Sequence, residues 1–180
     1  MAKKLDQLIV IDVESSCWEG STPKGQISDI IDIGICIIDI DSGQRLEKVS
    51  ILVKPEHSSL SEFCSKFTHL TQEQVNKGIS FKEACSLLKI KYLTKKRTWA
   101  SYGDYDRLQF DKQCKLYNVE YPFSSTHINI KNLFAIKKKL HQEVGMLKAL
   151  EILNLPHEGL HHKAIDDAWN IGNILLEILW

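Results

Sequence analysis

The chain has 180 residues, a length that suits one domain with its own buried core. Its hydrophobic fraction of 43% is that of an ordinary globular protein. Lysine plus arginine and aspartate plus glutamate are equal at 23 each, so the net charge is zero. This balance argues against a broad basic surface that grips long nucleic acid through its phosphates, although it leaves room for a site that holds a few nucleotides.

The cysteines and the N-terminus indicate a cytoplasmic chain. The five cysteines are scattered and none forms a C-x-x-C pair, so we expect reduced thiols and neither a disulfide framework nor a structural zinc site. The apolar run at residues 8–11 is followed at once by Asp12, which makes it too short for a signal peptide or a membrane span. We therefore expect one mature domain over residues 1–180, without membrane contact.

Strand signals come first along the chain. Residues 8–14 and 30–38 are rich in β-branched residues and too apolar for strands with one exposed face, so we expect two strands that are buried on both faces. Turn residues at 39–43 predict a hairpin that leads to a third strand at 48–53. Weaker strand signals occupy residues 99–102 and 127–130.

Helix signals dominate the rest of the chain. Thr71 with Gln74, and Ser80 with Glu83, each fit the capping box, in which a hydroxyl and a Glu or Gln three residues later satisfy free N–H groups at a helix start. Further helices are expected at residues 106–117, 131–140, 146–154 and 165–179. This order of elements predicts an α/β fold, in which helices cover a mixed sheet.

Asp12 and Glu14 end the first expected strand, and their spacing of two places both carboxylates on one face. Two carboxylates on one face repel each other unless a positive charge lies between them. Mg²⁺ and Mn²⁺ prefer oxygen ligands, so a divalent metal ion is one explanation of the pair. A strand end that reaches solvent is the other explanation, and Asp-x-Glu alone does not decide between them.

The last expected helix begins with a second acidic signal. On a helical projection from Asp167, three isoleucines fall within about 40° of it, namely Ile171, Ile174 and Ile178. Asp167 is therefore expected on the packed face, where a carboxylate needs a partner or a metal ion. Asp166 is expected to face water, at a helix start where the helix dipole favours negative charge.

Two further groups are ambiguous from the pattern alone. His162 precedes Asp167 by five residues, so it is expected in the loop before the helix. An imidazole there either takes a proton from water at a metal site or is simply solvated. Asp104 and Asp106 lie at an expected strand-to-helix junction, where either residue suits a helix cap.

Three segments, taken in order, carry a family resemblance: Asp12-Val-Glu14, Tyr105-Asp-Arg-Leu-Gln-Phe110 and His162-Lys-Ala-Ile-Asp-Asp167. Together they resemble the DEDDh exonucleases of the DnaQ-like class. The resemblance implies an RNase H-like fold, with a mixed five-stranded sheet packed by helices on its faces. It also selects Asp106 over Asp104, and it agrees with the helical projection on Asp167.

Within that class the chain is similar to the Eri-like branch, which includes the histone-mRNA 3′-exonuclease and bacterial KapD-like proteins. The similar segments are Asp12-Val-Glu-Ser-Ser-Cys-Trp18, Leu60-Ser-Glu-Phe-Cys64, Thr71-Gln-Glu-Gln-Val75, and Gly159-Leu-His-His162 through Asp166-Asp-Ala-Trp-Asn170. Two positions depart from the branch. His69 stands where glycine is common, and Asp29 stands where glutamate usually begins the second strand.

The resemblance implies a metal-dependent 3′→5′ exonuclease that acts on single-stranded RNA or DNA ends and releases nucleoside 5′-monophosphates. Its cofactors would be two divalent ions, Mg²⁺ or Mn²⁺, held by Asp12, Glu14, Asp106 and Asp167. His162 would be the general base that takes a proton from the attacking water, with Glu14 also counted as catalytic. The preference for RNA or DNA and any protein partner do not follow from the sequence.

Five residues are expected to contact the nucleic acid: Val13, Ser15, Phe63, Leu70 and Tyr105. Phe63 and Tyr105 would stack on the terminal base, although Phe63 also suits the hydrophobic core. By family resemblance, Leu70 would wedge near the last base.

Three other functions would use the same fold. A proofreading exonuclease subunit of a polymerase would carry the same residues. A non-catalytic nucleic-acid-binding module would more readily have lost one of the acids or the histidine. An RNase H-like endonuclease is disfavoured, because His-x-Ala-x-x-Asp belongs to the end-cutting branch.

Overall fold

The computed structural model describes residues 3–180. Within that range one mixed sheet has the strand order β3-β2-β1-β4-β5. The strands are β1 Lys4–Ser15, β2 Ile30–Asp39, β3 Gln44–Leu52, β4 Arg97–Ser101 and β5 His127–Asn129. β1 is antiparallel to β2 and parallel to β4, which is parallel to β5. The expected five-stranded mixed sheet is thus confirmed, and β1 and β3 begin earlier than predicted.

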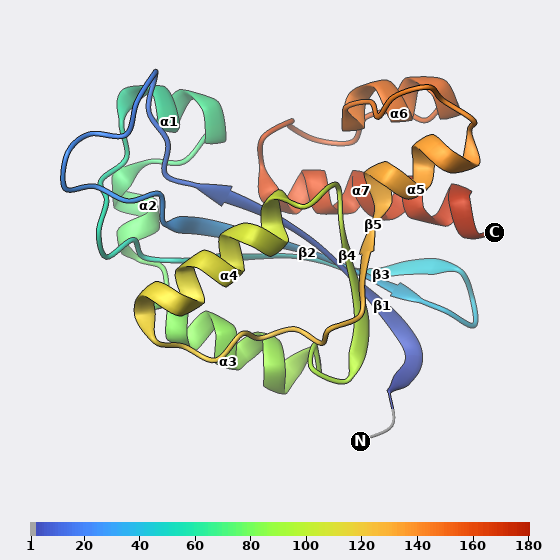
Figure 1. The fold of residues 1–180 in the computed structure, drawn as a ribbon, viewed down its shortest axis with the longest axis horizontal. Coiled ribbons are helices and arrows are strands. Elements are labelled where there is room, and N and C mark those ends of the chain that lie inside the picture. Colours follow the sequence, from blue (N-terminus) through green and yellow to red (C-terminus); the bar gives the residue numbers. More distant parts are fainter. Residues whose placement is uncertain (1–2) are drawn as a thin grey trace.

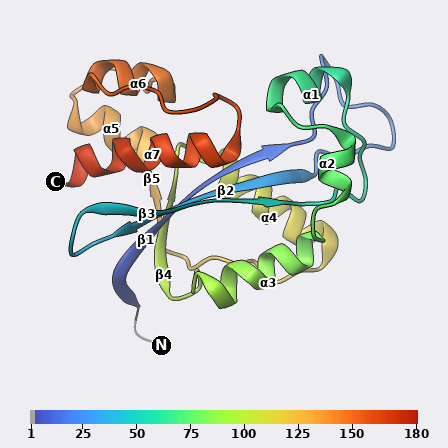
Figure 2. The ribbon, with the colours of Figure 1, turned by 180° about the vertical axis from the view of Figure 1, so that it is seen from behind.

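Helices cover both faces of this sheet. They are α1 Glu62–Thr68, α2 Gln72–Asn76, α3 Phe81–Lys91, α4 Tyr105–Tyr117, α5 Ile130–Lys137, α6 Met146–Leu153 and α7 Ala164–Leu179. α5, α6 and α7 lie on one face, and α3 and α4 lie on the other (Figure 1). The reverse view shows α1 and α2 at one end of the sheet (Figure 2). Both predicted capping boxes are present, at the starts of α2 and α3.

Alternate residues of β1 face opposite helical layers. Ile11 is fully buried in the core cluster that includes side chains of α3 and α4, and Val10 is fully buried in the cluster that includes side chains of α7. Burial of the strand on both faces is therefore confirmed. The same alternation carries Asp12 and Glu14 onto the face that α7 covers.

Gly34 allows the start of α7 to lie directly on the sheet. In β2 this glycine pairs in register with Asp12 of β1. A Cβ at position 34 would overlap the backbone carbonyl of Ala164, the first residue of α7. Because no side chain separates helix and sheet here, Asp167 in the first turn of α7 comes close to the acidic end of β1.

The cysteines are all free thiols, and four of them are buried while Cys17 is partly exposed. Among residues 3–180, the structure has no helix with the length and apolar character needed to cross a membrane.

Candidate active site

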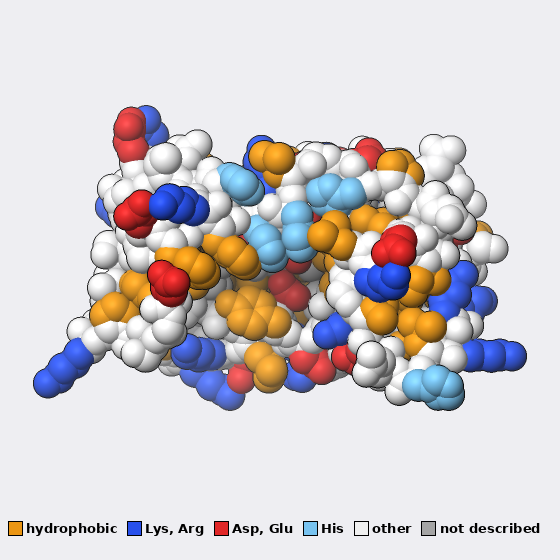
Figure 3. All heavy atoms as spheres, turned by 90° about the horizontal axis from the view of Figure 1, so that it is seen from above, with side chains coloured by type: hydrophobic (Ala, Val, Ile, Leu, Met, Phe, Trp, Pro, Cys, Tyr) orange, Lys and Arg blue, Asp and Glu red, His pale blue; other side chains and the backbone are white. Residues whose placement is uncertain are grey.

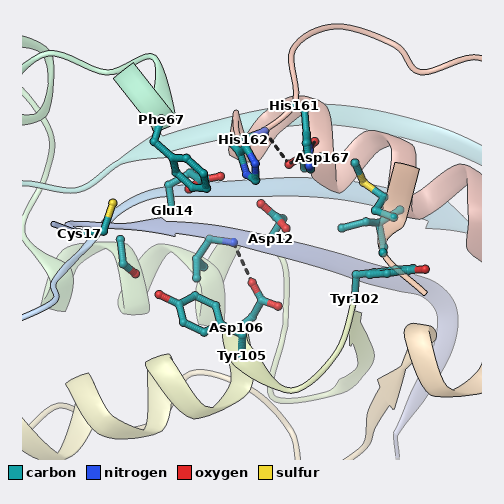
Figure 4. A pocket seen from close by; sticks show the side chains of 15 residues that line it. Asp12, Glu14, Cys17, Phe67, Tyr102, Tyr105, Asp106, His161, His162 and Asp167 are labelled. Carbon is teal, nitrogen blue, oxygen red and sulfur yellow. Dashed lines mark hydrogen bonds and ion pairs between the residues drawn. The ribbon is translucent and has the colours of Figure 1, made fainter. Parts of the chain in front are cut away.

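A pocket of about 400 Å³ opens beside the end of β1. Its lining includes the four carboxylates and the histidine that the sequence singled out: Asp12, Glu14, Asp106, His162 and Asp167. They come from β1, from the start of α4 and from the start of α7 with its preceding loop (Figure 4). In the space-filling view, acidic side chains lie at the bottom of a hollow with histidines beside it (Figure 3). Segments far apart in sequence therefore meet at one site.

The backbone of β1 holds Asp106 in the pocket. Its Oδ1 accepts a hydrogen bond from the N–H of Val13 at 2.9 Å, and the residue is only 4% exposed. Asp104 is instead the exposed N-cap residue of α4, makes no side-chain cap bond, and pairs with Arg107 at 3.0 Å. The geometry therefore agrees with Asp106 as the third acid of the site.

Asp167 lies in a polar network at the start of α7. Its Oδ2 accepts the backbone N–H of His162 at 2.9 Å, and His161 Nδ1 lies 3.0 Å from the same oxygen. Asp167 is 4% exposed, so its predicted place on the packed face is confirmed. His161 was not predicted as a site residue, and its position next to His162 was the only signal for it in the sequence.

Asp166 does not face water, so that prediction was wrong. The residue is 7% exposed, forms an ion pair with Lys48 of β3, and accepts the N–H of Leu160 at 3.0 Å. The helical projection failed because it ignores the loop before α7, which folds back over the first turn of the helix. Gly159 permits this path, since its φ is +84° and a Cβ there would overlap the Asp166 carboxylate.

Burial raises the pKa values of three of the clustered carboxyls, those of Asp12, Glu14 and Asp106. It raises the pKa of Glu14 to about 9, with the charge of Asp167 as the next cause. It raises the pKa of Asp106 to about 6, and that of Asp12 well above its ordinary value, where Asp106 adds to the effect. No lysine or arginine within residues 3–180 forms an ion pair with any of the four acids. Oxygen-only clusters of this kind suit a hard divalent cation.

His162 lies beside these acids with a left-handed backbone, at φ +63°. Its ring stacks on Phe67 on one side and on His161 on the other, with centroid distances of 3.8 Å to each. Burial lowers the pKa of His162 and His161 lowers it further, whereas Asp167 opposes the shift. A lowered pKa favours a neutral imidazole, which is able to accept a proton.

The predicted substrate contacts divide between the pocket and its surroundings. Val13, Ser15 and Tyr105 line the pocket, and Ser15 Oγ is buried without a hydrogen-bond partner in residues 3–180. Phe63 does not line it and is 40% exposed on α1, so it is not a core residue either. Leu70 is 7% exposed and belongs to a small core cluster.

Phe67 lines the pocket but was not predicted as a site residue. It lies one helical turn beyond Phe63 on α1, and the two rings stack with a centroid distance of 5.7 Å. Phe67 reaches the pocket and contacts the His162 ring, as Figure 4 shows. Residue type and spacing offered no means to choose between the two phenylalanines.

The two departures from the family pattern lie outside this pocket. His69 ends α1 at φ +59°, a conformation that glycine adopts at lower cost. Asp29 is fully buried and accepts hydrogen bonds from the His57 N–H at 2.8 Å and the Tyr117 hydroxyl at 2.7 Å. Its role is therefore to fasten the loop that carries His57.

Comparison with known proteins finds a family model that matches most of the chain. Residues 9–175 match the RNase_T family model, described as Exonuclease. The 3′-5′ exoribonuclease 1 of Rattus norvegicus is 29% identical, over 97% of this chain and 53% of that protein. "Probable 3′-5′ exonuclease KapD" of Bacillus subtilis is 28% identical, over 91% of this chain and 80% of that protein. The chain thus spans about half the length of the exoribonuclease relatives that it matches.

Solved structures with the same fold include two at 28% identity. The nuclease domain of 3′hExo, a DEDDh family member bound to rAMP, has a TM-score of 0.86 and covers 99% of this chain and 94% of that one. A 3′-exonuclease structure that describes recognition of the histone mRNA stem-loop has a TM-score of 0.84 and covers 97% and 81%. These likenesses confirm the expected RNase H-like fold.

Proposed function

The chain belongs to the exonuclease family, in its DEDDh branch, and we propose that it removes nucleotides from the 3′ ends of single-stranded RNA or DNA as nucleoside 5′-monophosphates. One observation carries the proposal: four carboxylates and a histidine, from three separate parts of the chain, line one pocket. The names of the exoribonuclease relatives favour RNA as the substrate.

The family uses divalent metal ions, and we propose that two Mg²⁺ or Mn²⁺ ions bind Asp12, Glu14, Asp106 and Asp167. Three of the four acids are less than a tenth exposed, and Asp12 opens to the pocket. The raised pKa values of Asp12, Glu14 and Asp106 support the binding of cations by these carboxylates. So does the fact that, among residues 3–180, no lysine or arginine forms an ion pair with them. When bound, such ions activate water and offset the charge that develops on the phosphate.

His162 is the proposed general base. The hydrogen bond from its backbone N–H to Asp167 holds the residue beside the acids, and its lowered pKa favours the neutral form. Phe67 packs on one face of the imidazole, which limits the directions from which water reaches it. The proton of the attacking water would pass to a ring nitrogen of His162.

The terminal nucleotide is proposed to lie against Tyr105, Ser15 and Val13. Tyr105 lines the pocket and offers a ring on which a base can stack. Ser15 Oγ, which lacks a partner in the described chain, is available for a hydrogen bond to the substrate. Phe67 joins this set, because it lines the pocket where Phe63 and Leu70 do not.

We further propose that residues 1–180 act as a single exonuclease domain in the cytoplasm. All five cysteines are free thiols, which suits a reducing compartment. A polymerase subunit would use the same pocket, and tight binding to a large protein partner would distinguish that role.

The direct test uses 5′-labelled single-stranded RNA and DNA with Mg²⁺, Mn²⁺ or EDTA. A ladder that shortens from the 3′ end only with metal is expected for the wild type and for Asp104→Ala, the exposed neighbouring acid. Asp12→Ala should be folded and inactive. A folded, active Asp12→Ala protein would contradict the model, and cleavage of a circular substrate would indicate an endonuclease.

A further inference from the structure

Two histidines and Asp167 form a cluster at the edge of the proposed site. His157 and His161 lie in the loop between α6 and α7. His161 Nδ1 is 3.0 Å from one oxygen of Asp167, and His157 Nε2 is 3.9 Å from the other. One ligand atom from each of the three residues lies within 4.8 Å of the others. Figure 4 shows His161 and Asp167 pointing toward each other. The proposed catalytic chemistry does not use either ring.

A ring nitrogen of His157 also indicates a ligand at this cluster. His157 Nε2 is buried, and within residues 3–180 it has no hydrogen-bond partner. Its separation of 3.9 Å from Asp167 is too long for a hydrogen bond. A buried polar atom without a partner costs free energy, so its position toward a carboxylate indicates that another species binds between them.

The backbone next to His157 is fixed by α7 through Glu158. The side chain of Asn170 accepts the Glu158 N–H at 3.0 Å and donates to the Glu158 carbonyl at 2.9 Å. The Glu158 carboxylate in turn accepts hydrogen bonds from Trp169 at 3.1 Å and from Arg45 at 3.0 Å. Because Glu158 directly follows His157, these contacts hold the histidine near Asp167. A preformed site binds an ion without the entropy cost of ordering a loop.

We propose that His157, His161 and Asp167 bind a zinc ion, at a position separate from the carboxylate metal site but sharing Asp167 with it. Two imidazoles and one carboxylate are a donor set that Zn²⁺ takes in proteins, with water in the fourth position. Mg²⁺ and Mn²⁺ favour oxygen ligands instead. Ligand atoms around a tetrahedral zinc ion lie roughly 3.3 Å apart, so small side-chain rotations close the observed cluster onto the ion.

Zinc at this position inhibits the nuclease, a consequence that rests on the proposed function. The ion engages a carboxylate that the catalytic ions need. It also binds His161, whose ring stacks on His162 at 3.8 Å. Bound zinc therefore competes with Mn²⁺ for Asp167. It also fixes the ring that stacks on His162, the proposed general base.

Binding is tested by calorimetric titration of the tag-free protein with zinc chloride alone. His157→Gln is expected to weaken zinc binding by at least about tenfold, since even loss of a group that only hydrogen-bonds to a metal ligand costs that much. His141→Gln is the matched control, because His141 is exposed and lies in a different segment. Asp12→Asn, which alters the carboxylate site, should keep the zinc affinity. Co²⁺ absorption spectra of the same proteins report whether the ion is tetrahedral.

Equal zinc affinity in the wild type and His157→Gln would overturn the proposal, as would a wild type that binds no zinc. Loss of binding in Asp12→Asn, with binding retained in His157→Gln, would place the ion among the carboxylates and overturn it as well. Zinc should also inhibit Mn²⁺-supported cleavage more strongly in the wild type than in His157→Gln. If no protein cleaves nucleic acid but zinc binding depends on His157, the proposed function fails and the zinc site stands.

Discussion

The backbone N–H of His162 donates a hydrogen bond to the carboxylate of Asp167 at 2.9 Å. The proposed base therefore depends on a proposed metal ligand for its position. The φ of His162, +63°, is uncommon for a residue other than glycine, and this bond is one of the contacts that hold it. Substitutions of the two residues should consequently be non-additive in their effects on the cleavage rate.

Replacement of His162 by alanine should lower kcat by a factor of about 10² to 10⁴, because the proton acceptor is lost while the carboxylates remain. Single-turnover cleavage of labelled RNA with Mn²⁺ measures this effect separately from product release. His141→Ala, which removes an exposed histidine elsewhere, should keep the wild-type rate. A His162→Ala protein that cleaves at the wild-type rate would exclude the base role.

The metal-free protein should lose stability as pH rises. Burial raises the folded pKa of Glu14 to about 9 and that of Asp106 to about 6. A carboxyl whose pKa is raised in the folded protein contributes stability that is fully present below its unfolded pKa of about 4. That stability is lost as pH rises through the folded pKa. Tm in EDTA is therefore expected to fall between about pH 5 and pH 9.

Added Mn²⁺ should raise Tm, and more at high pH than at low pH, because the ionised carboxylates then have a partner. Thermal scans over this pH range, with EDTA or Mn²⁺, measure both effects. Glu14→Gln should flatten the metal-free pH dependence. A wild-type Tm in EDTA that rises steadily across the window would contradict the role of these carboxyls.

Replacement of Tyr105 by alanine should raise KM for single-stranded oligonucleotides more than it lowers kcat. Loss of base stacking corresponds to roughly 1–3 kcal/mol, or about 5- to 150-fold in KM. Tyr105 is 55% exposed, so its removal does not empty the core. Steady-state kinetics with Phe63→Ala as the comparator measure the effect, since Phe63 lies outside the pocket. An unchanged KM in Tyr105→Ala would exclude stacking, and an equal rise in Phe63→Ala would assign Phe63 a direct contact.

Asp6→Asn should destabilise the protein at neutral pH by about 1 kcal/mol or less, because the carboxylate is partly exposed and screened. Arg97, which is 9% exposed, donates to both oxygens of Asp6 at 2.9 and 2.8 Å. That guanidinium holds the pKa of Asp6 well below its usual range. The stability is therefore present above the unfolded pKa and lost as pH falls through the folded one. Urea unfolding of Asp6→Asn beside Asp41→Asn, an exposed turn residue, measures the difference; equal stability of the two variants would contradict it.

The strands and two of the helix starts could be predicted because the residues that favour them lie close together in the sequence. The apolar run of β1 is buried on both faces, as a run without polar alternation predicts. The capping boxes of α2 and α3 likewise depend on residues three apart, such as Thr71 and Gln74. α1 was missed because it is seven residues long and exposes Phe63 and Phe67, so it has no apolar stripe to recognise.

The metal-ligand candidates could be chosen because the family motifs and the helical projection agree on Asp167. Asp166 could not be placed from its own helix, since Lys48 of β3 and the loop before α7 bury it. Phe67 and His157 had no sequence signal for the same reason. Their positions depend on contacts between segments that are distant in the sequence, and such contacts cannot be predicted from the pattern of one segment.

Gly34 has a consequence for how loss-of-function data on this protein should be interpreted. Glycine has no side chain that could take part in the reaction. A methyl group there would nevertheless overlap the Ala164 carbonyl and lift the first turn of α7. That displacement would carry Asp167 away from Asp12 while much of the sheet stayed intact. A mutational screen for activity would therefore rank position 34 with the catalytic acids. Only a measurement of metal affinity beside folding stability would show that the glycine sets a distance and takes no part in the chemistry.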